Sequence, residues 1–227
     1  MHEGHRDRLK NKFLNNGIDG FELHEILELA LFYAIPRKDT NELAHRLLSH
    51  FGNFTAVLEA PVNCLTKIDG IGKSAAIFLK LIPCLSRIYY ESKCSCGEKI
   101  PTLSELRKSI CTKFIGRTSE VFMLFVMDAK GKLICEQVIS TGNANAVNIN
   151  MKKVIEIITS HNAASVIVAH NHPSGIALPS RSDLISTKKL STIFSSMGIA
   201  FLDHIIVCED EYVSLKECTE LNINCFS

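Results

Sequence analysis

The sequence predicts two parts, an all-helical region over residues 1–92 and an α/β layered domain over residues 101–227. Two patterns support this division. Before Glu91, apolar residues recur at helical spacing between capping and turn residues. After Pro101, apolar runs of strand length alternate with amphipathic helical segments, which is typical of helices packed on a sheet.

The first region is expected to contain several helices separated by turn and capping residues. Glu25 to Tyr33 is apolar on a helical period, and Pro36 ends this helix because proline lacks the N–H group that would continue it. A capping cluster at residues 39–41 begins the next helix, and Gly52 closes it. The expected helices span residues 25–33, 41–51 and 54–59, with a longer apolar helix running through Leu85 and Ile88.

Residues 65–76 resemble a helix-hairpin-helix motif with Gly70, Ile71 and Gly72 as the hairpin. Glycines let the backbone approach a phosphate closely, and free N–H groups at the next helix start point toward it. The motif predicts weak, non-specific DNA contact. Residues 1–92 nevertheless carry 11 Lys and Arg against 11 Asp and Glu, whereas strong DNA binders are usually basic. A turn that only packs helices or contacts protein is an equal alternative.

The second region alternates helices and strands. Val121 to Met127 is continuously apolar, as expected for a strand that is buried on both faces. A turn signal at residues 128–131 joins it to a second strand in a hairpin. The expected elements are a helix at 104–113, strands at 121–127 and 132–140, a helix at 151–159, a strand at 164–169, a helix at 183–197 and a strand at 199–208.

The stretch from Glu91 to Lys99 is polar and without periodicity, so it is expected to link the two regions. It contains Cys94 and Cys96. Their C-x-C spacing, with no second Cys or His pair nearby, differs from that of a zinc knuckle, and incidental thiols are the better interpretation.

Composition narrows the class of protein only a little. A net charge of +1 gives no electrostatic reason to expect a nucleic-acid or membrane partner. The nine cysteines are an odd number, and charged residues crowd the first eight positions where a secretory signal would be apolar. The chain is therefore expected to be cytoplasmic, with reduced thiols and no membrane span.

The residues that carry chemistry gather between Ala163 and Asp183. An apolar strand leads into His170 and His172, and side chains two residues apart on a strand share a face, so both imidazoles can converge on one point. A turn begins at Pro173, and Asp183 lies at the start of the next helix. Two imidazoles and a carboxylate suit zinc with a fourth position left for water.

These residues also have simpler interpretations. Histidines are more often ordinary surface or core residues than ligands. Ser180 followed three residues later by Asp183 has the pattern of a helix capping box. Spacing alone therefore leaves metal binding and helix capping open.

The same stretch resembles a known family. From His170 to Asp183 it matches H-x-H-x7-S-x2-D, the pattern of JAMM (MPN+) metalloproteases. The fuller string H-N-H-P-S-G-x-x-x-P-S-x-x-D, with Thr187 and His204 downstream, is similar to the RadC family, and the resemblance covers nearly the whole chain. It implies an α/β JAMM (MPN-like) layered domain preceded by a small all-α helix-hairpin-helix domain.

The resemblance implies that His170, His172 and Asp183 bind zinc. It further implies a metallopeptidase that hydrolyses an amide or isopeptide bond in a protein or peptide substrate. The chain departs from the family at residues 148–153, where a His-Pro-Arg-Glu-like string is usual. The departure leaves the metal ligands intact, but any substrate contact made by that segment cannot be carried over.

Two further roles come only from the resemblance. Glu120, immediately before the first strand, would be the general acid/base, and nothing else selects it over Glu136 or Glu156. Ser180 would help to stabilise the developing oxyanion. His204 matches the family string, but the sequence suggests no physical role for it.

Two other functions remain open. One is a DNA-associated accessory protein in which the hairpin supplies the activity and the metal is structural or regulatory. The other is a non-haem iron(II) oxygenase, since two histidines and a carboxylate are also the ligands of that class. That triad normally lies on an all-β barrel, which the alternation of helices and strands argues against.

Overall fold

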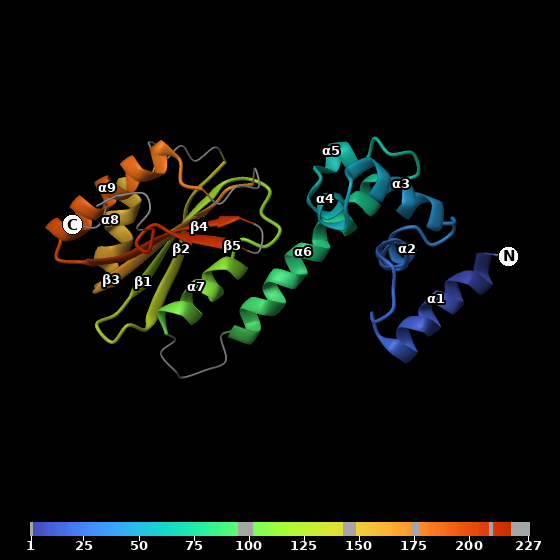
Figure 1. Ribbon diagram of the computed structural model, residues 1–227, viewed down its shortest axis with the longest axis horizontal. Helices are drawn as coiled ribbons and strands as arrows, with labels where there is room; N and C mark the ends of the chain where they lie inside the picture. The colour runs from blue at the N-terminus through green and yellow to red at the C-terminus, as the bar shows by residue number, and fades with distance from the viewer. Residues whose placement is uncertain (1, 95–101, 143–148, 174–177, 209–210, 219–227) are drawn as a thin grey trace. The chain divides into compact units, whose positions relative to one another are not determined.

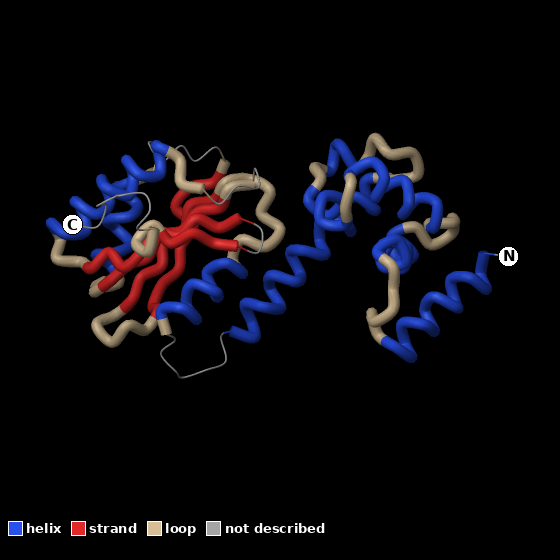
Figure 2. Tube along the Cα trace, in the orientation of Figure 1, coloured by secondary structure: helices blue, strands red, loops and turns tan. Residues whose placement is uncertain are grey.

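The computed structural model describes residues 2–94, 102–142, 149–173, 178–208 and 211–218. They divide into two compact units, Met1–Ile88 and Tyr89–Ser227. Helices build the first unit, whereas the second contains a mixed sheet covered by helices (Figures 1 and 2). Within the described ranges, no helix is both long and apolar enough to span a membrane.

The helical unit packs around a core made almost entirely of aliphatic side chains. Its helices are α1 (His2–Asn16), α2 (Leu23–Ala34), α3 (Asn41–Phe51), α4 (Phe54–Glu59), α5 (Val62–Leu65) and the start of α6 (Lys73–Cys94). The fully buried leucines of this core are Leu27, Leu31, Leu47, Leu65 and Leu79. The helices predicted at 25–33, 41–51 and 54–59 are confirmed, because the apolar face of each contributes to this core.

The glycine hairpin joins a single-turn helix, α5, to the long helix α6. Gly70 has φ +92°, in the region that favours glycine, and a Cβ at this position would lie 3.5 Å from the side chain of Leu43. Ile71 is buried in the core. The hairpin therefore packs against α3, as the packing alternative requires, while Gly72 has open space around it.

The prediction of a linker over residues 91–99 is wrong for its first four residues, 91–94. Helix α6 continues through Glu91 to Cys94. Residues 91–94 contain neither glycine nor proline, and extending an existing helix by such residues costs little compared with starting a new one. Cys96 and the rest of the predicted linker lie outside the described residues.

Five strands form one sheet in the order β2-β1-β3-β4-β5. They are β1 (Val121–Met127), β2 (Leu133–Thr141), β3 (Ser165–Asn171), β4 (Ala200–Cys208) and β5 (Glu211–Ser214). β3 and β4 are parallel, and the other neighbouring pairs are antiparallel. The four predicted strands are confirmed, and the short edge strand β5 is an addition to them.

Helices cover both faces of this sheet. Helices α8 (Met151–Ser160) and α9 (Arg181–Ser196) lie on one face, and α7 (Leu103–Thr112) lies on the other (Figure 1). The central strands β1 and β3 are buried along their whole length, which explains their continuous apolar sequence. Because β1 is antiparallel to β3, its N-terminal end and the C-terminal end of β3 meet at one edge of the sheet.

A buried ion pair fixes α7 to the sheet. Arg107 places Nη2 2.7 Å and Nε 2.9 Å from Oδ2 of Asp203 on β4, and Ser214 Oγ donates to the same oxygen at 2.7 Å. Asp203 therefore has a structural role on the α7 face. Since neighbouring residues on a strand point to opposite faces, His204 projects toward α9.

Candidate metal centre

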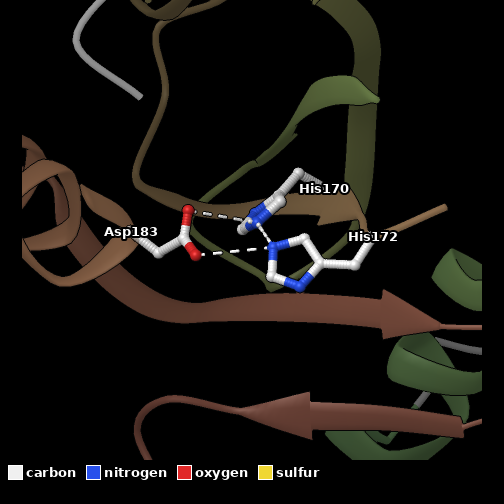
Figure 3. A group of neighbouring side chains, drawn as sticks. All are labelled: His170, His172 and Asp183. Carbon is white, nitrogen blue, oxygen red and sulfur yellow. Dashed lines mark hydrogen bonds and ion pairs between the residues drawn. The ribbon is translucent and has the colours of Figure 1, made fainter. Parts of the chain in front are cut away.

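Three polar side chains converge where β3 ends and α9 begins (Figure 3). Nε2 of His170 lies 3.0 Å from Nε2 of His172. The carboxylate of Asp183 places Oδ1 3.3 Å from Nε2 of His170 and Oδ2 3.4 Å from Nε2 of His172. Elsewhere in the described residues, no group of three His, Cys, Asp or Glu side chains is arranged to hold a metal ion.

Strand geometry brings the two histidines together, as the spacing predicted. The ladder of β3 continues one residue past its last assigned position, because the His172 N–H donates to the carbonyl of Val207 on β4 at 2.9 Å. His170 and His172 therefore project from the same face of the sheet. That face is the one covered by α9, which carries Asp183 in its first turn.

The imidazoles of His170 and His172 differ in solvent exposure. His170 is buried and His172 is half-buried, so the pair lies at the rim of the sheet rather than deep inside it. His172 is therefore the more accessible of the two imidazoles.

The spacing of these atoms fits a metal ion. Zinc binds nitrogen and carboxylate oxygen at about 2.0–2.1 Å, so neighbouring ligand atoms of a tetrahedral site lie about 3.3 Å apart. The two Nε2 atoms lie 3.0 Å apart, and one ligand atom from each of His170, His172 and Asp183 lies within 4.8 Å of the others, so the three groups can reach one ion. Two imidazoles and a carboxylate would also suit iron(II), but helices cover both faces of this sheet, unlike the all-β barrel usual for those oxygenases.

The Asp183 carboxylate is held in its ionised form, which metal binding requires. Burial by itself would raise the pKa of Asp183, but the neighbouring imidazoles of His170 and His172 and the hydroxyl of Ser180 outweigh it and hold the pKa well below its usual range. Metal ligands must be deprotonated, so an ionised Asp183 is ready to bind a cation.

The helix-capping interpretation of Ser180 is also confirmed. The Asp183 N–H donates to Ser180 Oγ at 3.2 Å, and the Ser180 N–H donates to Asp183 Oδ2 at 2.7 Å, which together form a capping box. Ser180 Oγ additionally lies 2.6 Å from Asp183 Oδ2. Asp183 therefore takes part in the capping box and also faces the two histidines. The capping box that begins α9 orients its carboxylate.

Behind the histidine pair lies a buried polar group, formed by His204 and Thr187, for which the sequence suggested no physical role. Nε2 of His204 is 2.8 Å from Nδ1 of His170, and Nδ1 of His204 is 2.6 Å from Oγ1 of Thr187. Burial lowers the pKa of His204 well below its ordinary value, so its imidazole is neutral. The family string includes both Thr187 and His204, but only the structure shows that they bond to each other and to His170.

Asn171, between the two histidines, ties the start of β1 to β3. Its Oδ1 accepts from the N–H of Val121 at 2.8 Å, and its Nδ2 donates to the carbonyls of Ser119 at 3.1 Å and Arg117 at 3.3 Å. The side chain is buried, and its bond to Val121 is buried as well. Asn171 thereby fixes the backbone on both sides of Glu120.

Glu120 is half-buried at this edge of the sheet but is not one of the three converging residues. Phe122 is paired with His170 across β1 and β3. Continuing that register by two residues places Glu120 opposite His172, and directly opposed residues of an antiparallel pair share a face. The backbone thus brings Glu120 to the side of the sheet on which the histidines lie.

The two rival glutamates lie elsewhere. Glu136 on β2 is paired with Phe125, whose ring lies in the core under α7, and its carboxylate is 2.7 Å from Nζ of Lys113. Glu156 is exposed on α8. Neither position is near the convergence of His170 and His172.

Replacing Asn171 with alanine is expected to loosen the segment before β1. One buried and two partly buried hydrogen bonds would be lost, and the unsatisfied Val121 N–H alone would cost about 1–3 kcal/mol. Denaturant unfolding should report the loss of stability, and hydrogen exchange of the Val121 amide should accelerate.

Asn171→Asp is the matched variant for that prediction. Its carboxylate can still accept from Val121, but it cannot donate to the carbonyls of Arg117 and Ser119. It should therefore protect the Val121 amide better than alanine does while still lowering stability. Wild-type exchange at Val121 in the alanine variant would show that the Asn171 side chain does not hold this segment.

Comparison with known proteins adds a family and a relative. The family described as "RadC-like JAB domain" matches residues 100–221 of this chain, which include all the residues of the candidate site. Over 222 residues the chain is 35% identical to UPF0758 protein FN0909 of Fusobacterium nucleatum subsp. nucleatum. That similarity covers 95% of this chain and 96% of the relative.

Proposed function

This chain belongs to the RadC family, and we propose that it is a zinc-dependent hydrolase, a metallopeptidase that acts on an amide or isopeptide bond. One observation carries the proposal: one ligand atom from each of His170, His172 and Asp183 lies within 4.8 Å of the other two, as a single metal ion requires. Three protein ligands leave the fourth position open, and an open position distinguishes catalytic zinc from structural zinc.

The proposed mechanism assigns one role to each group. Bound zinc would supply a Lewis acid and make hydroxide available near neutral pH. Glu120 takes the proton of the attacking water and returns it to the leaving amine. Ser180, whose hydroxyl donates to Asp183 in the structure, would give up that bond and donate its proton to the oxyanion that develops on the substrate.

A trapping experiment tests this function. Full-length Glu120→Gln protein, loaded with zinc, should retain a substrate that wild-type protein cleaves and releases. Candidates enriched by this variant, but not by His172→Ala, would be incubated with zinc-loaded wild-type protein, and mass spectrometry should find a new chain end. If the zinc-loaded wild-type protein cleaves none of them, the peptidase assignment fails.

The proposed setting is a reducing one, the cytoplasm. The cysteines whose side chains the structure describes are all free thiols. Free thiols persist where cellular reductants keep them reduced. This supports the proposed location and is independent of the metal site.

A second proposal concerns the glycine hairpin, which we propose makes weak, non-specific contact with DNA through Gly70, Ile71 and Gly72. Open space around Gly72 favours it, because a phosphate could approach the backbone there. The hollow beside the hairpin is lined by His45, Arg46, His50 and Lys67 but also by Glu42 and Asp69. This mixture of charges is the reason to expect low affinity.

Binding of the full chain to duplex DNA is expected to be independent of sequence and to weaken steeply with added salt, because phosphate contacts release counterions. Fluorescence anisotropy at two salt concentrations measures this. Gly72→Ala should leave the fold intact, since nothing lies within 4 Å of the added methyl group, yet it should obstruct a phosphate. Unchanged affinity in this variant, or tight binding to one sequence at high salt, would contradict the proposal.

A further inference from the structure

A chain of three short hydrogen bonds leads from one candidate ligand to the backbone of another. Nδ1 of His170 lies 2.8 Å from Nε2 of His204, and Nδ1 of His204 lies 2.6 Å from Oγ1 of Thr187. Thr187 Oγ1 in turn lies 2.6 Å from the carbonyl oxygen of Asp183. His204 and Thr187 are both 0% exposed, so water cannot replace any member of the chain.

The last bond sets the direction of the others. A carbonyl oxygen can only accept, so the single hydroxyl proton of Thr187 is donated to Asp183. Oγ1 of Thr187 must then accept from Nδ1–H of His204. A neutral imidazole with its proton on Nδ1 has an acceptor at Nε2, and this atom receives Nδ1–H of His170.

Only this direction leaves His170 able to bind a metal. With its proton on Nδ1, His170 has a free lone pair on Nε2, the atom that faces His172 and Asp183. In the reverse direction, Thr187 would donate to His204, and the proton of His170 would lie on Nε2. That proton would occupy the position of the metal, and the Asp183 carbonyl would lose the hydroxyl donor of Thr187.

We propose that His204 and Thr187 are positioning residues that hold the proton of His170 on Nδ1 and so present Nε2 to the metal. The inference rests on the metal site of the proposed function. Phe122 supports the same arrangement, since its ring stacks on His170 at 6.2 Å between centroids and meets His204 edge-on at 5.8 Å. These contacts keep both imidazoles from rotating out of line.

The loss of these hydrogen bonds sets the expected change in zinc affinity. Hydrogen-bond partners behind a ligand commonly change metal affinity by about 10- to 100-fold when they are removed. His204→Leu and Thr187→Val should therefore weaken zinc binding by about 10- to 100-fold. His204→Gln can accept from His170, and Thr187→Ser keeps a hydroxyl, so both should restore most of the affinity.

Thr192→Val is the matched control for the helix. Thr192 makes the same kind of bond as Thr187, from Oγ1 to the carbonyl four residues earlier, at 3.0 Å to Lys188, but it is farther along α9 and exposed. This variant should bind zinc like the wild type. Zinc affinity would be measured by chelator competition, and thermal unfolding of the metal-free proteins would check that each variant folds.

A second measurement reads the protons directly. In zinc-loaded wild-type protein, long-range proton–nitrogen NMR of the imidazoles should find the protons of His170 and His204 on Nδ1. If the wild type binds zinc but His204 carries its proton on Nε2, or if both His204→Leu and Thr187→Val bind zinc normally, the inference is overturned. Failure of the wild type to bind zinc would instead overturn the metal site itself. Should His204→Leu not fold, Thr187→Val and the NMR measurement decide.

Discussion

Asp183→Ala and His172→Ala are each expected to abolish zinc binding by a protein that otherwise holds about one zinc per chain. Each variant removes one of three ligands, and the remaining two cannot hold zinc in competition with water and buffer. The fold should survive, because neither His172 nor Asp183 belongs to the two hydrophobic clusters that cover the faces of the sheet. Metal analysis of purified, dialysed protein gives the number of zinc ions per chain.

The control for Asp183→Ala must separate a lost ligand from a lost helix cap. Asp183 belongs to the capping box of α9, so its removal also destabilises the start of that helix. Ser180→Ala breaks the same box but leaves all three ligands in place, and it should retain zinc. Full zinc retention in both ligand variants would show that the metal site is assigned to the wrong residues.

The metal group could be predicted because it depends on local rules. The period of two along a strand places His170 and His172 on one face, whatever the rest of the chain does. The capping pattern places Asp183 at the start of the following helix. A strand, a turn and a helix that are consecutive in sequence are close in space, so the three residues meet without any knowledge of the strand order.

The residues around that group could not be predicted in the same way. His204 reaches His170 across 34 positions of the sequence, and Asn171 reaches Val121 across 50. These contacts exist only because β3 lies between β1 and β4, an order that no local pattern specifies. The end of α6 escapes prediction for a different reason: a polar sequence without glycine or proline can extend a helix or leave it.

Glu120→Gln is expected to keep its zinc and to lower the rate of hydrolysis by about 100-fold or more. The amide is nearly isosteric with the carboxylate and leaves His170, His172 and Asp183 untouched, so metal content should not change. It cannot take a proton from water, so the chemical step should slow. The measurement pairs metal analysis with kcat on a substrate obtained from the trapping experiment.

Two other glutamates provide the controls for this prediction. Glu136→Gln removes an ion pair with Lys113 on the α7 side of the sheet, and Glu156→Gln changes an exposed residue of α8. Neither carboxylate lies on the edge where β1 begins and β3 ends, so both variants should hydrolyse substrate at close to the wild-type rate. If Glu120→Gln stays active while one of these becomes inactive, the proton is carried by that residue, and the register that places Glu120 opposite His172 does not extend beyond the strand.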